Sequence, residues 1–224
     1  MDYAITPYPA MAHSFEALQP GRRIDMIVLH ATCGDRLGDL YTLSGRDRRH
    51  LASSHYYITK LGEIYQLVQD KDIAWHAGIS YWQGESGCNK FSLGIELENR
   101  NDGKDKYPQT QLDAAIWLVQ TKVRQYRIPR SRLVRHADVS PNRKTDPIGF
   151  PWESFKASVY QGMPEEPPPP PVAMPPQEIQ LRDALLDHSY ERANHVFNPD
   201  SPLHRFALQH RLGPPMASPF RFTA

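Results

Sequence analysis

Two histidines stand at places in the sequence where short apolar runs end, and an aspartate follows the second of them. His30 closes the run IDMIVLH, His136 closes LVRH, and Asp146 follows within RKTDP. Two imidazoles and a carboxylate form a typical catalytic zinc set, because three protein ligands leave a fourth position for water. The spacing alone is weak support, since the chain holds 10 histidines. The residue types nevertheless make this trio the first hypothesis for a metal site.

A sheet flanked by helices would be needed to position such a trio. Strand and helix patterns alternate along the first part of the chain, which favours an α/β fold with a mixed central sheet. A side chain at the end of a strand can then project into a cleft at the sheet edge. The expected elements are a strand at 24–30, a hairpin of 55–58 and 63–68, strands at 92–98 and 133–135, and helices at 110–126 and 152–160.

The clearest helix pattern covers residues 110–126. Thr110 is a plausible N-cap for it. Its apolar side chains recur at helical spacing and predict one buried face, made of Leu112, Ile116, Val119 and Val123.

Composition excludes several classes of protein. The 224 residues include 26 Lys and Arg against 25 Asp and Glu, so no strong electrostatic footprint for nucleic acid is expected. No apolar run approaches the length of a membrane span. The N-terminus lacks a basic start followed by an apolar block, and we see no signal peptide in it. Cys33 and Cys88 are expected to be free, buried thiols rather than a disulfide.

A proline-rich segment divides the chain. Prolines crowd residues 164–176, and such a run forms a semi-rigid spacer rather than a helix or a sheet. We therefore expect a catalytic domain at 1–160, a linker at 161–177 and a small, mostly helical C-terminal module at 178–224. This module is predicted to bind the cell wall or to dock on the first domain. A second metal site at its histidines, His188, His195, His204 and His210, is not favoured.

Five sequence segments together resemble a known family. The segments are IVLHAT, SSHYYI, AWHAG, GCNKFSLGIELEN and RHADVSPNRKTDP. Their order and intervals resemble those of the type 2 zinc-dependent N-acetylmuramoyl-L-alanine amidases. That family includes phage endolysins, the amidase that recycles anhydromuramyl peptides, and animal peptidoglycan-recognition proteins. The resemblance covers roughly residues 24–155.

The resemblance implies a role for each matching residue. His30, His136 and Asp146 would bind Zn²⁺, Glu96 would act as general base, and Lys144 would stabilise the oxyanion. Many phage and animal members carry a tyrosine at the position of Ser54, and Glu96 would do its proton work here. We also expect substrate contacts from Trp75, His76 and Asn99, although Asn99 could equally belong to a solvated rim.

Several residues keep alternative interpretations. Asp138 is a rival ligand, although we expect it to be a loop residue that bonds the backbone. Glu98 is a reserve candidate for the base, and His76 could steady the cleft instead of contacting substrate. The other expectations are structural: His55 as a sheet residue, and residues 46–50 as an exposed helix face.

The predicted function is hydrolysis of the bond between N-acetylmuramic acid and L-alanine in peptidoglycan, during wall lysis or turnover. Zinc-activated water would hydrolyse this bond. We expect the protein to be a monomer that acts at the bacterial cell wall. One alternative is a cytoplasmic amidase that recycles soluble anhydromuramyl peptides, which fits the missing signal peptide. Another is a non-catalytic peptidoglycan receptor, a class that usually loses a metal ligand.

Overall fold

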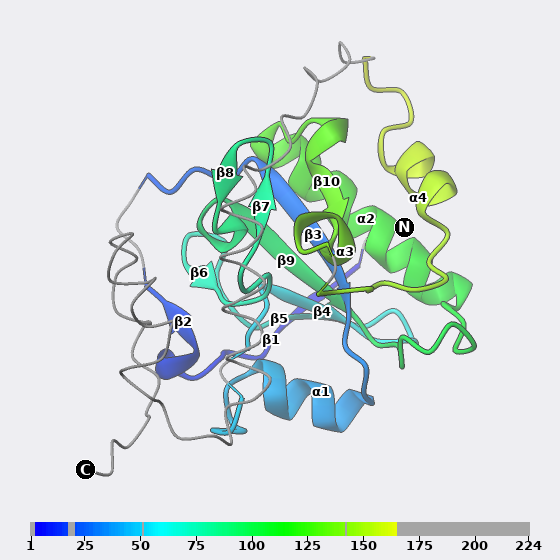
Figure 1. Cartoon of the computed structure of the whole chain (residues 1–224). Helices are drawn as coiled ribbons and strands as arrows, with labels where there is room; N and C mark the ends of the chain where they lie inside the picture. Colours follow the sequence, from blue (N-terminus) through cyan, green and yellow to red (C-terminus); the bar gives the residue numbers. More distant parts are fainter. Residues whose placement is uncertain (1–2, 18–20, 51, 142, 165–224) are drawn as a thin grey trace. The chain divides into compact units, whose positions relative to one another are not determined.

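A central mixed sheet organises the computed structural model, which describes residues 3–17, 21–50, 52–141 and 143–164 (Figure 1). The predicted α/β fold class is therefore confirmed. The C-terminal module and most of the linker lie outside the described residues. In spatial order the six strands are β1 (Ile5–Pro7), β5 (Ile64–Gln66), β4 (Tyr56–Ile58), β9 (Ser92–Leu97), β3 (Met26–Ala31) and β10 (Leu133–Arg135).

The two central strands, β3 and β9, are buried on both faces. They run parallel over six residue pairs, from Met26 opposite Ser92 to Ala31 opposite Leu97. Every residue of both strands is buried, which agrees with the near-continuous apolar sequence of internal parallel strands. The strands at 24–30 and 92–98 were thus predicted within two residues. The hairpin was also correct, since β4 and β5 pair antiparallel.

Two helices cover one face of the sheet. α2 (Gln109–Tyr126) packs with α4 (Trp152–Val159) over a core that includes Ile27, Leu29 and Ile95. The capping prediction was wrong, because Pro108 is the N-cap and Thr110 lies inside α2. The buried face of α2 is also rotated from the predicted one. It consists of Gln111, Ala114, Ala115, Leu118, Val119, Lys122 and Val123.

The other face of the sheet carries a smaller helix that the sequence patterns did not reveal. α1 (Arg36–Leu43) lays Leu40 and Leu43 against Tyr57 and Leu67. Asp35 caps it by accepting a hydrogen bond from the Gly38 amide at 3.1 Å. Residues 46–50, predicted as an exposed helix face, form bends and turns beyond this helix instead.

Short elements complete the described part of the chain. Two small antiparallel pairs, β2 with β6 and β7 with β8, lie outside the main sheet. Their bounds and those of the remaining helical turns are β2 (Phe15–Glu16), β6 (Ile73–Ala74), β7 (Tyr81–Trp82), β8 (Glu85–Ser86), η1 (Ala12–Ser14), η2 (Cys88–Lys90), η3 (Arg130–Arg132) and α3 (His136–Val139).

Candidate metal centre

A row of polar side chains crosses the sheet near the carboxyl ends of its parallel strands. Tyr57 on β4 pairs with Glu96 on β9, and Glu96 pairs with His30 on β3. Arg135 of β10 pairs with Leu29, so His136 comes next beside His30, and the two imidazole rings lie 4.3 Å apart between centroids. Register partners face the same side of a parallel sheet. We call Tyr57, Glu96, His30 and His136 the cross-strand row.

Asp146 joins this row from the loop after α3. The side-chain donor atoms of His30, His136 and Asp146 all lie within 4.8 Å of one another. Oδ2 of Asp146 lies 3.1 Å from His136 Nδ1 and 3.6 Å from His30 Nδ1. Its position is fixed by the backbone, because the Asp146 carbonyl accepts a hydrogen bond from the Ala137 amide at 3.0 Å. The structure therefore brings together the three residues predicted as metal ligands.

The surroundings of His30 and Asp146 favour the protonation states that metal ligands need. Burial, followed by the charge of His136, lowers the pKa of His30 to about 4, so its imidazole is neutral at pH 7. Burial alone would raise the pKa of Asp146, but the adjacent imidazoles of His136 and His30 hold it below its usual value. A neutral imidazole and an ionised carboxylate are the forms that coordinate a cation.

Glu96 faces the same space and is nearly buried. Its Oε1 lies 3.9 Å from His30 Nδ1. Its Oε2 is buried and has no hydrogen-bond partner among the described residues. Burial and the nearby charge of Asp146 raise the pKa of Glu96 well above its usual value. A buried carboxylate with a free oxygen is a group that can exchange protons with a ligand in this space.

Lys144 and Trp75 are only partly buried. Lys144 is close enough for its charge to lower the pKa values of His30 and Glu96. Its backbone amide donates to the Ser140 carbonyl at 3.0 Å, which holds the lysine in the loop that leads to Asp146. The Trp75 amide donates to Ser53 Oγ at 2.9 Å. The predicted contacts of both side chains with substrate stay predictions.

Two residues predicted to contact substrate lie deeper than expected. His76 is 7% exposed and lies behind His30, with its Nδ1 3.0 Å from His30 Nε2. Asn99 is fully buried, and its amide group donates to the Asp105 carbonyl at 3.1 Å. These positions favour the alternative in which His76 steadies the cleft, and they do not favour direct substrate contact by Asn99.

The rival residues have structural partners. His55 is fully buried, and its Nδ1 accepts a hydrogen bond from the Gly94 amide at 3.0 Å. Asp138 accepts a hydrogen bond from the Arg135 amide at 2.9 Å, although it lies in α3 rather than in a loop. Glu98 accepts from the Lys60 amide at 2.9 Å. Cys33 and Cys88 are free thiols as expected, but Cys33 is exposed.

The sequence patterns did not single out Tyr57, Asp39 or Arg143. Tyr57 lies beside Glu96 in the cross-strand row. Its hydroxyl donates a hydrogen bond to Asp39 Oδ2 at 3.0 Å. Arg143 donates to the carbonyls of Ala77 and Ile79 at 2.9 Å and so holds the backbone against which His136 packs. Only Arg143 had a usable signal, because it lies directly before Lys144 in the RKTDP motif.

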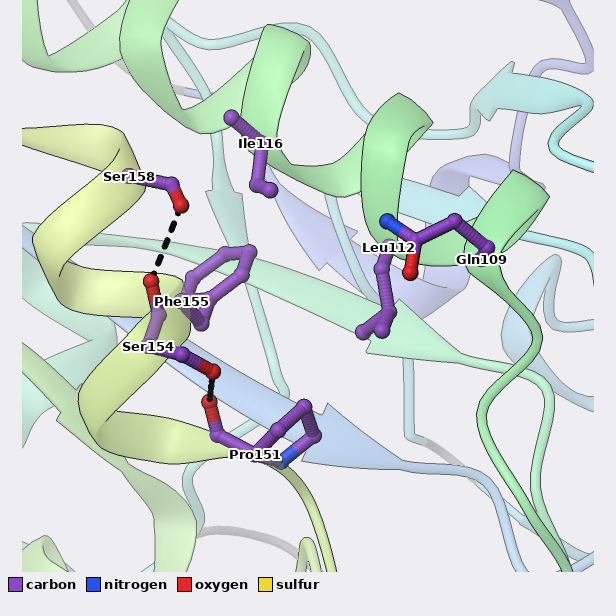
Figure 2. A pocket seen from close by; sticks show the side chains of 7 residues that line it. All are labelled: Gln109, Leu112, Ile116, Pro151, Ser154, Phe155 and Ser158. Atoms are coloured by element: carbon purple, nitrogen blue, oxygen red, sulfur yellow. Dashed lines mark hydrogen bonds between the residues drawn. The ribbon is translucent and has the colours of Figure 1, made fainter.

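A separate cavity between α2 and α4 does not belong to this site. It measures about 340 Å³, and Figure 2 shows the side chains that line it, among them Leu112, Ile116 and Phe155. These three residues belong to the same apolar cluster as Ile27 and Leu29 of β3. Because side chains alternate along a strand, His30 points to the opposite face of β3. The sheet thus separates this groove from the candidate metal centre.

Comparison with known proteins places the chain among peptidoglycan-active proteins. A family model described as N-acetylmuramoyl-L-alanine amidase matches residues 20–149. The N-acetylmuramoyl-L-alanine amidase AmiD of Escherichia coli is 37% identical over 146 residues, which is 58% of this chain. The 1,6-anhydro-N-acetylmuramyl-L-alanine amidase AmpD of Haemophilus influenzae is 40% identical over 109 residues, which is 48% of this chain.

A solved structure gives the same result. It is the complex of the E. coli AmiD with the substrate anhydro-N-acetylmuramic acid-L-Ala-D-gamma-Glu-L-Lys, with a TM-score of 0.57 and 35% identity. The match covers 63% of this chain and 60% of that one. This chain spans only 51% and 58% of the lengths of the AmiD and AmpD relatives. Within its described residues, no helix is long and apolar enough to cross a membrane.

Proposed function

This chain belongs to the N-acetylmuramoyl-L-alanine amidase family, as the match over residues 20–149 shows, and from that premise we propose that it hydrolyses the amide bond between N-acetylmuramic acid and L-alanine. One observation carries the proposal. Two imidazoles and a carboxylate converge within 4.8 Å of one another, and the free oxygen of Glu96 lies in the same cross-strand row.

We propose that His30, His136 and Asp146 hold Zn²⁺. The donor set fits this ion, since neutral imidazoles and one carboxylate are typical zinc ligands and three of them leave a position for water. Zinc would supply a bound water of lowered pKa and would polarise the carbonyl of the scissile amide. The three side chains are at most 6% exposed, so they lie in a recessed part of the structure.

Glu96 would carry the proton. Its carboxylate accepts a proton from the attacking water and passes it to the nitrogen of L-alanine as the carbon–nitrogen bond breaks. The products are then the carboxylic acid of the lactyl group on the sugar and a free amino group on the peptide. The position of Glu96 on β9, a strand that is paired with both β3 and β4, supports this role.

Lys144 would meet the negative charge that develops on the carbonyl oxygen. A fixed donor at such a position stabilises a transition state by roughly 2.7–4 kcal/mol in other hydrolases. Its place two residues before Asp146 ties it to the metal site through a short stretch of backbone. The two groups would thus have complementary roles: the ammonium group of Lys144 stabilises the negative charge, and the carboxylate of Glu96 transfers the proton.

The substrate class has two candidates, the polymeric cell wall and soluble anhydromuramyl peptides. The similarity to AmpD, over 109 residues at 40% identity, favours the soluble candidate. The proline-rich segment and the residues after it favour the polymer, because a tethered binding module raises the local concentration of enzyme at an insoluble substrate. We propose the bacterial cell wall as the place of action. A peptidoglycan receptor is disfavoured, because the full ligand set is present.

Product analysis tests the proposed reaction. The purified chain is incubated with whole sacculi and, separately, with a soluble anhydromuramyl tripeptide. We expect new amino groups that belong to L-alanine, with no new reducing ends on the sugars. New reducing ends would identify a glycosidase instead, and a cut elsewhere in the peptide would identify a peptidase. The ratio of the two rates then distinguishes the polymer from the soluble substrate.

A further inference from the structure

His76 is connected to His30 through a chain of hydrogen bonds that begins at a serine hydroxyl. Ser92 Oγ donates to the Cys88 carbonyl at 2.6 Å and lies 3.2 Å from His76 Nε2. His76 Nδ1 lies 3.0 Å from His30 Nε2. All three side chains in the chain, those of Ser92, His76 and His30, are buried. Their hydrogen bonds therefore have no bulk water as a substitute.

The protons along this chain can be assigned from chemistry alone. A hydroxyl has one proton, and Ser92 uses it on the Cys88 carbonyl, so its oxygen must accept from His76 Nε2–H. A neutral imidazole has only one N–H, which leaves His76 Nδ1 as an acceptor. His30 must then donate from Nε2. Its remaining nitrogen, Nδ1, is left with a free lone pair toward Asp146, 3.6 Å away.

A glycine makes the room that His76 needs. Gly94 lies in the middle of β9, and a Cβ atom added there would lie 2.3 Å from Cγ of the His76 ring. Glycine weakens a strand interior, so its presence often marks a close approach by another group. The backbone of Gly94 needs no positive φ. The space for the imidazole is therefore what requires glycine at this position.

We propose that His76 is a positioning residue that fixes the tautomer and orientation of His30, so that Nδ1 of His30 faces the metal position. This inference rests on the proposed metal site, but not on the reaction assigned to it. Ligating histidines generally donate their second N–H to a protein acceptor, which orients the ring and raises its basicity. His136 has such an acceptor in the Ala77 carbonyl, 3.3 Å from its Nε2. His76 does the same for His30.

The first test compares two side chains of equal shape at position 76 in the full-length chain. His76→Asn keeps an oxygen acceptor where Nδ1 lies, whereas His76→Leu has none. Zinc dissociation constants from chelator competition should rise by about 10–100-fold for His76→Leu and clearly less for His76→Asn. Gly94→Ala, which displaces the ring without removing a polar group, should resemble His76→Leu. Equal weakening by Leu and Asn would reduce His76 to a packing role and overturn the proposal.

A matched control comes from the other face of the sheet. Tyr56→Phe removes a partly buried hydrogen bond to Asp70 Oδ1, of 2.6 Å, and leaves the hydrogen bonds between Ser92, His76 and His30 intact. It should lower stability but leave the zinc dissociation constant unchanged. If Tyr56→Phe weakens zinc binding as much as His76→Leu, general destabilisation explains the effect and the proposal fails.

The second test needs no metal. In the zinc-free chain labelled with ¹⁵N-histidine, ring-nitrogen chemical shifts should show the proton of His30 on Nε2 and its Nδ1 bare. Ser92→Ala is the smallest change that interrupts the series of hydrogen bonds from Ser92 to His30, and it should shift the tautomer balance of His76. A proton on Nδ1 of His30 in the wild-type chain would contradict the proposal. This readout stays decisive if the chain binds no zinc, a result that would sink the proposed function alone.

Discussion

His30 and Glu96 are in-register partners on β3 and β9, and His30 Nδ1 lies 3.9 Å from Glu96 Oε1. Two rigid, fully paired strands thus set the distance between a proposed metal ligand and the proposed base. A site on strands is held more tightly than one on loops. Asp146 and Lys144 come to this site from a loop, and that loop is fixed through Ala137 and Ser140.

Replacement of Glu96 should separate proton transfer from metal binding. Glu96→Gln keeps the shape of the side chain but removes the base, so kcat should fall by roughly 10²–10⁴-fold while zinc content stays the same. The matched control is Glu98→Gln, because Glu98 lies just beyond the end of β9 and accepts a hydrogen bond from the Lys60 amide instead. A dead Glu98→Gln beside an active Glu96→Gln would show that the other carboxylate is the base.

Removal of the Lys144 ammonium should affect the chemical step. Lys144→Met should lower kcat by roughly 10²–10³-fold with a smaller change in KM, since the charge it meets develops only in the transition state. Lys71→Met, a change on an exposed turn, serves as the control. Steady-state kinetics on a soluble muropeptide measures both parameters. A rise in KM at constant kcat would assign Lys144 to substrate binding instead.

Asp39 should make stability depend on pH. Burial raises the pKa of Asp39 to about 6, although hydrogen bonds from Thr32 and Tyr57 oppose the shift. Because the folded pKa exceeds the unfolded one, this stabilisation is full below the unfolded pKa near 4 and is lost as pH rises through 6. The wild-type chain should therefore gain about 1 kcal/mol over Asp39→Asn between pH 8 and pH 5.

Urea unfolding of both chains at the two pH values measures this difference. Subtraction of the Asp39→Asn curve removes the contributions of the other titrating groups, provided that they are unchanged. We expect the difference in free energy of unfolding between the two chains to increase on acidification. A gap that narrows, or one that does not change, would mean that Asp39 is ionised without cost in the folded chain.

The proline-rich segment and the residues after it should promote hydrolysis of polymeric peptidoglycan. All proposed zinc and proton-transfer residues precede residue 164, so deletion of residues 164–224 should harm hydrolysis of whole sacculi more than that of soluble muropeptides. The reason is the lost tether, which concentrates enzyme on an insoluble surface. Rates on both substrates and a melting temperature give the answer. Equal losses with a lower melting temperature would identify the C-terminal residues as a structural brace.

The strands that form the site could be predicted from the sequence, because their apolar runs are short, buried and end in polar residues. β10, for example, has the predicted bounds of residues 133–135. The helix α1 could not be predicted in this way. Only Leu40 and Leu43 of its eight residues make apolar packing contacts, and Gly38 weakens the helical pattern. Its stability comes from packing on Tyr57, a contact that no local pattern reveals.

The contact between His76 and His30 could not be predicted from the sequence either. His76 lies 46 residues from His30 in the chain, and spacing cannot show that one imidazole donates to the other. A local signal did exist, in the glycine at the centre of the apolar strand SLGIEL. A glycine in a strand that is otherwise built to be buried indicates that something large approaches it. Here that group is the ring of His76.

The most direct test of the central claim is metal analysis joined to activity. We expect about one zinc per chain, bound by nitrogen of His30 and His136 and by oxygen of Asp146. Release of L-alanine amino groups from peptidoglycan should stop when a chelator removes this zinc and should return when zinc is restored. His136→Ala, which removes one ligand, should bind zinc weakly and stay inactive. Full activity of the zinc-free wild-type chain would contradict the account.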